Sequence, residues 1–344
     1  MSNHELWIDS VLPFHNRLTE SVVTILQNLL KTNNINYLSI SGRTKNKKSA
    51  LEKINRKNYQ FPSDELTDLS GIRVIVYFES DIDKVSKIIE SSFNVDMKNS
   101  LNQDKKLSTN QLGYRSIHYV CDIGKNRECL PEFNGLKNLK FEFQVRTVLQ
   151  HAWAELAHDS NYKFTDKLPP DIERSLYLYS GMLELIDKGF NELSLKIDDY
   201  TQKAKKDIEE GVFYKTLDSI NLKEFFLNWA NKNSIRLLPK SYPDTNKIIN
   251  ELNEYGINTI DELNKLIPEN YAEKINSLNI RTNLAGSIRD WMIINNPKKY
   301  TTKVKYTWKL EKEDIEEYKE VMNDEQYKQF KNAFKNEINS LLNR

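Results

Sequence analysis

The segment GIRVIVYF at residues 71–78 constrains the fold more than any other part of this chain. Its residues are β-branched or aromatic almost throughout, and such a run is typical of a strand buried in the middle of a sheet. Two further segments, YRSIHYVCDI and LKFEFQVRT, also have strand character. They span residues 114–123 and 139–147, and weaker edge strands are expected near 36–40 and 94–98.

Helical patterns alternate with these strands. Apolar residues recur at helical spacing in residues 14–32, 81–93, 148–164 and about 171–205. Strands interleaved with helices predict an α/β (α+β) fold, in which a sheet is flanked by helices. The stretch from Ser49 to Glu52 has the form of a capping box, so a further helix is expected to begin at Ser49.

The C-terminal part of the chain contains no motif typical of a catalytic or ligand-binding site. Residues 206–344 are polar with helical patterns, and Thr259 to Glu262 form another capping box. A chain of 344 residues is long enough for two domains. We therefore predict one domain over residues 1–205 and an all-helical module over 206–344.

The charge composition gives the chain as a whole no net positive field that would attract nucleic acid or a membrane surface. The chain has 50 basic and 49 acidic residues, so its net charge is +1, and any attraction to an anion must be local. The N-terminus lacks the pattern of a signal peptide, and no apolar stretch approaches the ~18 residues of a membrane helix. Cys121 and Cys129 lack the spacing of a zinc site. These features predict a cytoplasmic protein with free thiols and no membrane partner.

A local concentration of charge lies between residues 41 and 57, SGRTKNKKSALEKINRK. It contains seven basic residues and one acid, Glu52. Such a run is compatible with a solvated helix surface, a nucleic-acid patch or a cradle for a polyphosphate. A helix N-terminus near Arg43 and Lys45 would favour an anion there.

The strand FEFQVRT indicates a site on one face of the sheet. Period-2 geometry puts its apolar residues on one face and Glu142, Gln144 and Arg146 on the other. A row of acid, amide and base is unusual for plain surface. In YRSIH the same geometry directs Tyr114, Ser116 and His118 to one side.

Two carboxylates are candidate metal ligands. Asp68 precedes the buried strand, where the end of a sheet meets solvent, and Glu142 lies on the polar face of FEFQVRT. Together they could bind Mg²⁺, which prefers few carboxylates and keeps positions open for phosphate oxygens. Asp68 by itself is equally typical of a turn or a helix cap.

Four ordered segments resemble the synthetase domain of the RelA/SpoT family. They are GRTKNKKSALEKI, DLSGIRVIV, GYRSIHYV and FEFQVRT followed by HAWAELAHDSNYKF. The resemblance covers residues 36–165, and the helices at 14–32 and 171–205 flank it. It implies a nucleotidyltransferase-like mixed sheet and transfer of pyrophosphate from ATP to the 3′-hydroxyl of GDP or GTP. The products would be the alarmone (p)ppGpp and AMP. The family's small synthetases also suggest a homo-oligomer.

The resemblance assigns the ATP side of the site residue by residue. Arg43 and Arg73 match arginines that bracket the adenine, a role suited to planar guanidinium groups. Asp68 matches the Mg²⁺ ligand. The phosphate cradle corresponds to Lys45, Ser49 and Lys53.

On the acceptor side, Glu142 matches the carboxylate that deprotonates the ribose hydroxyl or completes the metal site. Tyr114 matches the tyrosine that stacks on the acceptor base. His118 and Arg146 match residues near the acceptor phosphates and ribose, and Gln144 lies where the family contacts guanine.

Two positions depart from the family pattern, and both are on the acceptor side. Asn110 stands where small alarmone synthetases often have lysine, and His151 stands where many have Asn or Asp. An alternative is therefore a toxin-type relative that pyrophosphorylates the 3′ CCA end of tRNA or an adenine nucleotide, with an antitoxin or regulatory partner bound through the C-terminal module. A second alternative is a non-catalytic nucleotide-binding regulator, although that class would lack Asp68 or Glu142. No hydrolase domain is expected, because the histidines that it needs upstream are missing.

Overall fold

The computed structural model describes residues 3–102, 116–163, 169–238 and 245–342, and for 101–102, 157–163 and 342 it describes the backbone only. It divides into two compact units, Met1–Leu195 and Lys196–Arg344. This division falls within helix α7 (Pro170–Glu209), on which the boundary drawn from the sequence at 205 also lies. Each unit is described separately.

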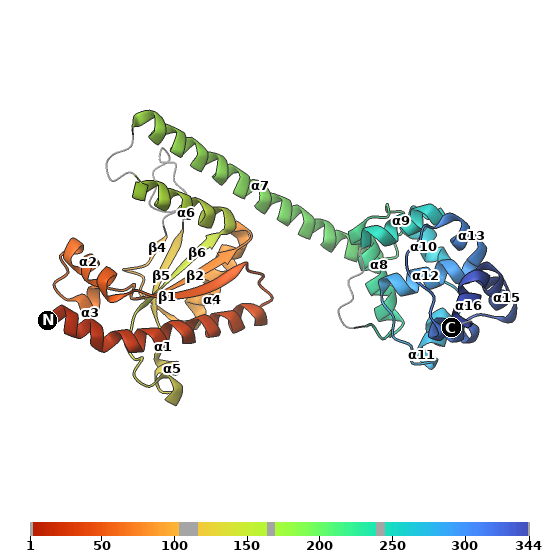
Figure 1. The fold of residues 1–344 in the computed structure, drawn as a ribbon, viewed down its shortest axis with the longest axis horizontal. Coiled ribbons are helices and arrows are strands. Elements are labelled where there is room, and N and C mark those ends of the chain that lie inside the picture. Colours follow the sequence, from red (N-terminus) through yellow and green to blue (C-terminus); the bar gives the residue numbers. More distant parts are fainter. Residues whose placement is uncertain (1–2, 103–115, 164–168, 239–244, 343–344) are drawn as a thin grey trace. The chain divides into compact units, whose positions relative to one another are not determined.

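The first unit is built on one mixed sheet (Figure 1). Its strand order is β1-β2-β6-β5-β3, with β4 paired to β5. β2 and β6 run parallel, and the other neighbouring pairs are antiparallel. The bounds are β1 Ser39–Thr44, β2 Ser70–Val76, β3 Asn94–Val95, β4 Leu101–Asn102, β5 Ile117–Asp122 and β6 Phe141–Thr147. The predicted sheet flanked by helices is confirmed.

One face of the sheet packs on helices α1 (Asn3–Thr32) and α4 (Glu79–Ser92) (Figure 1). The apolar residues of β6 alternate strictly with polar ones, and Phe141, Phe143 and Val145 are fully buried against these helices. Burial of side chains of this size is the main favourable term in folding. The predicted two-faced character of β6 is therefore confirmed, and Glu142, Gln144 and Arg146 lie on the opposite face.

Helix α6 (Val148–Lys163) follows β6 directly and contacts β2 and β6. Short elements complete the unit, and they are α2 (Lys47–Lys57), α3 (Pro62–Glu65), α5 (Lys125–Glu128) and the 3₁₀ turn Pro131–Phe133.

Three local expectations differ from the structure. Helix α1 begins at Asn3, not at residue 14, and contains Pro13. The edge strand expected near 36–40 is β1, Ser39–Thr44, so the basic run begins inside a strand. Gly42 on β1 allows α1 to approach closely, because a Cβ at this position would lie 2.5 Å from Thr19 Cγ2. Helix α2 begins before Ser49, because Asn46 is its N-cap and accepts a hydrogen bond from the Ser49 amide.

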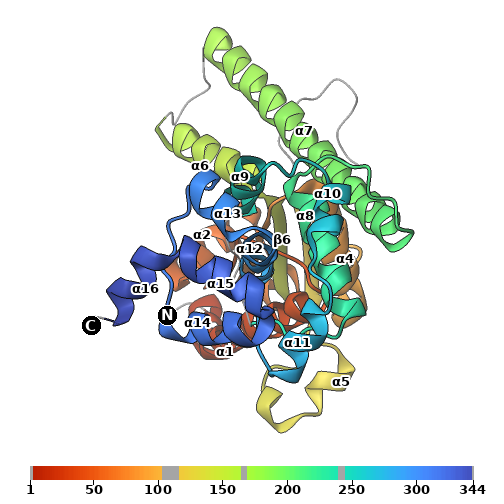
Figure 2. The same cartoon turned by 90° about the vertical axis from the view of Figure 1, so that its right-hand side faces the viewer.

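The second unit is helical, as expected. Figure 2 shows α12 (Leu284–Asn295) at the centre of its helices, and Ile288, Trp291 and Met292 on α12 are fully buried. The capping box from Thr259 to Glu262 is confirmed. The other helices are α8 Ser219–Lys232, α9 Thr245–Tyr255, α10 Ile260–Leu266, α11 Tyr271–Ser277, α13 Pro297–Lys303, α14 Lys312–Val321, α15 Asp324–Ala333 and α16 Lys335–Leu342.

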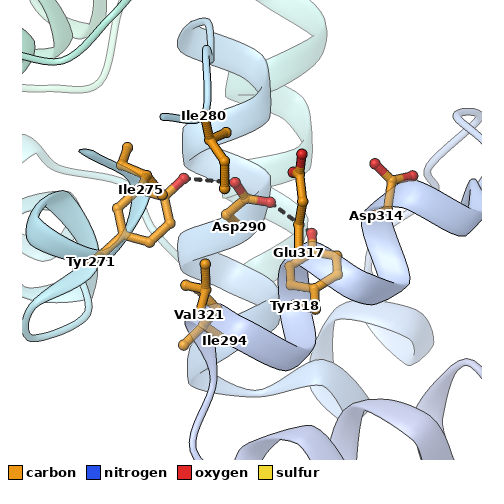
Figure 3. Close-up of a pocket in the computed structure, with 9 residues that line it drawn as sticks. All are labelled: Tyr271, Ile275, Ile280, Asp290, Ile294, Asp314, Glu317, Tyr318 and Val321. Carbon is orange, nitrogen blue, oxygen red and sulfur yellow. Dashed lines mark hydrogen bonds between the residues drawn. The ribbon is translucent and has the colours of Figure 1, made fainter. Parts of the chain in front are cut away.

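A small pocket in this unit surrounds a buried acid (Figure 3). Asp290 on α12 accepts hydrogen bonds from the hydroxyls of Tyr271 (2.6 Å) and Tyr318 (2.7 Å), so it joins α11, α12 and α14. Burial raises the pKa of Asp290 to about 6, although both tyrosine hydroxyls oppose this shift.

In the described part of the chain, no helix has the length and apolar character needed to cross a membrane. Cys121 is a buried free thiol on β5, and Cys129 is an exposed one.

Candidate active site

A pocket opens on the polar face of the sheet, over β1, β2 and β6. It holds about 730 Å³ of space, with the open solvent at its mouth included. The strand register explains its composition, because Arg43 pairs with Gly71 and Gly71 with Glu142, so the three positions lie in one row across the sheet. Its lining residues are Ser41, Arg43, Lys45, Asp68, Gly71, Arg73, Glu142 and Gln144.

Asp68 is held by two lysines at one end of this pocket. The ammonium groups of Lys45 and Lys53 each lie 2.7 Å from Asp68 Oδ2. Burial raises the pKa of Asp68, but the two lysines lower it by more, so the net shift is downward and the carboxylate is ionised. The other oxygen, Oδ1, is buried and has no hydrogen-bond partner in the described structure.

Glu142 is held in a similar way at the centre of the sheet. His118 Nδ1 lies 2.9 Å from Glu142 Oε1, and Gln144 Nε2 donates to the same oxygen at 3.0 Å. Burial raises the pKa of Glu142, whereas these two donors lower it, and the net shift is downward. Both donors use Oε1, so neither of them occupies the Oε2 atom of this pocket-lining residue.

The two polar partners of His118, Glu142 and Ser116, define its tautomer and orientation. Ser116 Oγ lies 2.7 Å from His118 Nε2. An ionised carboxylate only accepts hydrogen bonds, so Nδ1 carries the proton that faces Glu142. In the neutral ring Nε2 then accepts from the Ser116 hydroxyl. The serine therefore orients the ring that orients the carboxylate.

Two arginines lie farther along the same face. Arg73 Nη1 donates to Glu155 Oε1 on α6 at 3.0 Å, and His151 Nδ1 is 3.6 Å from the same oxygen, too far for a hydrogen bond. Burial lowers the pKa of Arg146, and the nearby charge of Arg73 lowers it further. Among the described residues, the buried Nε of Arg146 has no hydrogen-bond partner. This pair of guanidinium groups is suited to an anion, which would relieve their repulsion.

The donor set fits a hard divalent cation such as Mg²⁺. Such an ion takes oxygen ligands and is commonly held by one or two carboxylates together with substrate phosphates. The Oδ1 atom of Asp68, unpartnered in the described structure, and Oε2 of Glu142 are carboxylate oxygens of the type that such an ion would take. Among the described residues no cluster of three acidic, histidine or cysteine side chains offers a closed protein cage.

The structure brings most of the residues selected from the sequence into one place. Six of them line the pocket, namely Arg43, Lys45, Asp68, Arg73, Glu142 and Gln144. Lys53 and His118 contact the two carboxylates directly. Ser49 lies in the first turn of α2 and does not line the pocket, Arg146 and His151 lie beside Arg73, and Tyr114 falls outside the described residues.

Sequence reasoning missed three contributors. Ser41 and Gly71 line the pocket, and Glu155 pairs with Arg73 across 82 positions of the chain. The alternation of β1 could have indicated Ser41, which lies two residues before Arg43. No local signal predicts that Glu155 pairs with Arg73, because this contact depends on the packing of α6 on β2.

Comparison with known proteins gives a consistent result. The family described as "Region found in RelA / SpoT proteins" matches residues 42–167. The protein GTP pyrophosphokinase YjbM of Bacillus subtilis is 28% identical over 158 residues, which cover 45% of this chain and 70% of that protein. GTP pyrophosphokinase YwaC of the same species is 25% identical over 160 residues, which cover 45% of this chain and 73% of that protein.

Among solved structures, the small alarmone synthetase 1 from Bacillus subtilis aligns with a TM-score of 0.48 and 23% identity. The alignment covers 57% of this chain and 99% of that one.

Proposed function

Because residues 42–167 form a RelA/SpoT-family domain, we propose that this chain transfers the β,γ-pyrophosphate of ATP to the 3′-hydroxyl of GDP or GTP, which makes (p)ppGpp and releases AMP. Two relatives named GTP pyrophosphokinase support this reaction class. The observation that carries the proposal is the single pocket in which Arg43, Lys45 and Arg73 face Asp68 and Glu142.

Charge in this pocket suits a polyphosphate donor. Transfer of a phosphoryl-type group demands little covalent chemistry from the protein and depends on positioning and charge neutralisation. Lys45 and Lys53 flank the Asp68 carboxylate, so their ammonium groups lie where phosphate oxygens would approach it. Mg²⁺ bound at Asp68, with or without Glu142, would neutralise charge on those oxygens.

Glu142 is the residue we assign to the attacking hydroxyl. Its lowered pKa keeps it ionised, so Oε2 is ready to accept the proton of a 3′-hydroxyl at neutral pH. A base of low pKa removes that proton only as the new bond to phosphorus forms. His118 and Gln144 hold Oε1, so they keep the accepting oxygen directed toward the pocket.

The two arginines serve the anionic and aromatic parts of the nucleotides. Arg43 and Arg73 project from neighbouring strands, and a guanidinium plane can stack on a base or pair with phosphate. The buried Nε of Arg146 lacks a hydrogen-bond partner within the part of the chain that the structure describes, and an acceptor phosphate or ribose oxygen would satisfy it.

An acceptor competition tests the proposal. The full chain is incubated with Mg²⁺ and ATP labelled in its β- and γ-phosphates, together with GDP, GTP, ATP or bulk tRNA. We expect label on GDP or GTP, and its loss in Glu142→Gln. The matched control is Glu132→Gln, which changes an exposed carboxylate outside the pocket and should leave the rate unchanged.

The alternative outcomes are distinct. If label appears on tRNA or on ATP and not on guanine nucleotides, the proposed acceptor is wrong, but the assignment of the ATP-binding residues still holds. No label on any acceptor would overturn the enzymatic assignment. Equal activity in Glu142→Gln and the wild type would remove Glu142 from the reaction.

A further inference from the structure

The segment that joins helices α13 and α14 in the second unit is an extended stretch of chain with no strand beside it. It runs through residues 304–311 without a turn or a bend. Its backbone is extended at both ends, with φ −91° and ψ 129° at Val304 and φ −109° and ψ 168° at Glu311. Within the described residues, no backbone amide or carbonyl group from Tyr306 to Leu310 forms a hydrogen bond. A row of unpaired backbone groups on an extended segment is a template for a further strand.

The side chains of this segment alternate in the manner of a strand with one solvated face. Every second residue turns toward the core of the unit, and these residues are Val304, Tyr306, Trp308 and Leu310. The residues between them are exposed, and they are Lys305, Thr307 and Lys309. The segment therefore has a defined inner face, a defined outer face and two edges.

One edge of the segment faces α9 and the other is free. The Lys305 amide donates to Glu254 Oε2 on α9 at 2.6 Å. In a strand, the amide and carbonyl of one residue point to the same edge, and those of the next residue point to the opposite edge. The backbone groups of Tyr306, Trp308 and Leu310 therefore point away from α9, along an edge that can pair with another chain.

A groove lies between this segment and helix α16. It holds about 870 Å³ of space, with the open solvent at its mouth included. Tyr306 and Trp308 line it on one side and Ser340 on α16 lines it on the other, over the fully buried ring of Phe334. A groove beside a free strand edge suits an extended peptide, because the main chain pairs with the edge while alternate side chains enter the groove.

The outer face of the segment is basic. Residues 297–312 contain six lysines and one acid, Glu311. In the part of the chain that the structure describes, none of these lysines forms a salt bridge with a carboxylate. The groove is also lined by Glu337, whose carboxylate accepts a hydrogen bond from the Tyr306 hydroxyl at 2.9 Å. Opposite charges stabilise cross-strand pairs and like charges destabilise them, so an acidic strand is favoured and the same segment of a second copy is not.

Single-stranded RNA fits this surface less well than a peptide. RNA binding of this kind depends on aromatic faces that are open to bases. Tyr306 already stacks on Tyr300, with ring centroids 5.2 Å apart, and Trp308 Nε1 donates to the Tyr300 hydroxyl at 2.8 Å. A peptide, in contrast, uses both the free edge and the groove.

We propose that the groove between residues 304–311 and α16 binds an extended acidic peptide segment of another protein. The main chain of the peptide pairs with the free edge from Tyr306 to Leu310. Its apolar side chains enter the groove over Phe334, and the acidic side chains between them lie opposite Lys305 and Lys309. The second unit is thus a module that docks a partner protein.

Fluorescence anisotropy of the full chain tests this proposal with the labelled peptide EVEFEVE, in which acidic and apolar residues alternate. We expect saturable binding, and the basic counterpart KVKFKVK should bind at least about 30-fold more weakly. Two further versions of EVEFEVE carry N-methyl groups, either on the amides of the apolar residues or on those of the inner glutamates. Only one of these two sets of amides faces the edge, so one version should lose about 100-fold in affinity and the other less than about threefold.

Variants of the chain locate the contact. Lys305→Glu/Lys309→Glu should weaken binding of EVEFEVE about tenfold or more and strengthen binding of KVKFKVK. The matched control is Lys319→Glu/Lys328→Glu, which makes the same change of charge at exposed positions outside the groove.

A second pair of variants fills the groove. Ser340→Tyr should weaken binding of EVEFEVE about tenfold, whereas Asn339→Tyr, at the neighbouring exposed position outside the groove, should change it less than about twofold. All of these substitutions are at exposed side chains, so the variants should fold, and circular dichroism checks this.

Four results would overturn the proposal. Absence of EVEFEVE binding up to about 1 mM would remove the peptide site. Equal losses in the two lysine variants would move the contact away from the groove. Two N-methylated peptides that bind as tightly as EVEFEVE would exclude strand pairing. Displacement of EVEFEVE by a labelled oligouridylate that binds more tightly would make this surface a nucleic-acid site.

Discussion

Replacement of His118 distinguishes two roles for this residue. The family resemblance places it near the acceptor phosphates, whereas the structure has its Nδ1 2.9 Å from Glu142 Oε1. His118→Ala removes this donor. His118→Asn keeps a donor, because the side-chain amide nitrogen of Asn lies close to where Nδ1 lies in His. The two variants therefore differ in the hydrogen bond to Glu142.

The expected magnitude follows from the geometry. Hydrogen bonds to charged groups contribute about 1.5–3 kcal/mol when they are shielded from water. Both side chains are largely buried, with 19% and 16% of their surface exposed, so solvent screening reduces this figure little. If the bond orients Glu142 only in the reacting geometry, its loss lowers kcat by about 10- to 150-fold. His118→Asn should recover most of that rate.

Steady-state kinetics with GDP or GTP as the varied substrate separates the two roles. We expect kcat of His118→Ala to fall while KM for the acceptor changes less than about threefold. Ser116→Ala should give a smaller loss of the same kind, because Ser116 acts through the histidine ring. A rise in acceptor KM with unchanged kcat, equal in the Ala and Asn variants, would refute the positioning role and assign His118 to acceptor binding.

Three further outcomes are expected. Lys45→Ala should lower kcat/KM about 100-fold, because it removes a charged contact in the pocket. The control is Lys47→Ala, which should change kcat/KM less than about twofold, because the Lys47 ammonium pairs with Asp9 outside the pocket. Similar losses in both variants would contradict the assignment of Lys45 to the site. Chelation of Mg²⁺ should abolish pyrophosphate transfer. Asp68→Asn should raise the Mg²⁺ concentration that gives half-maximal rate about tenfold. If that concentration does not change, Asp68 is not a ligand of the metal. Folding raises the pKa of Asp290 to about 6, so protonation of this carboxyl favours the folded state. The free energy of unfolding of the C-terminal unit should therefore increase by up to about 1.4 kcal/mol when the pH is lowered from 8 to 5. Hydrogen exchange of α12, corrected for intrinsic rates, measures this gain, and a wild-type slope equal to that of Asp290→Asn would contradict it.

Local patterns in the chain predicted five of the six strands of the described sheet, but not β4, and one face of the site. The alternation of FEFQVRT depends on the period of two of a strand, which tertiary packing does not alter, so Glu142, Gln144 and Arg146 were assigned to one face correctly. The expected start of α2 at Ser49 failed, because Ser49 and Asn46 are both good caps and only the folded backbone selects between them.

The contacts between residues of the site could not be predicted from sequence patterns. Lys45 and Lys53 both bind Asp68 because α2 follows β1 and passes beside the start of β2. His118 faces Glu142 because β5 pairs antiparallel with β6 in a register that no local motif specifies. Register is set by side chains from several elements that pack together.

The amino-acid sequence alone determined that this chain builds a strand-centred domain with an acid, an amide and a base on one face of β6, and that a helical unit follows. These properties depend on residue type and spacing over a few positions. Only the tertiary structure decided which donors hold Glu142 and, among the described residues, which oxygen of Asp68 and which edge of residues 304–311 are left unpartnered. Those features arise when side chains far apart in the chain compete for the same contacts, and that competition is resolved by packing.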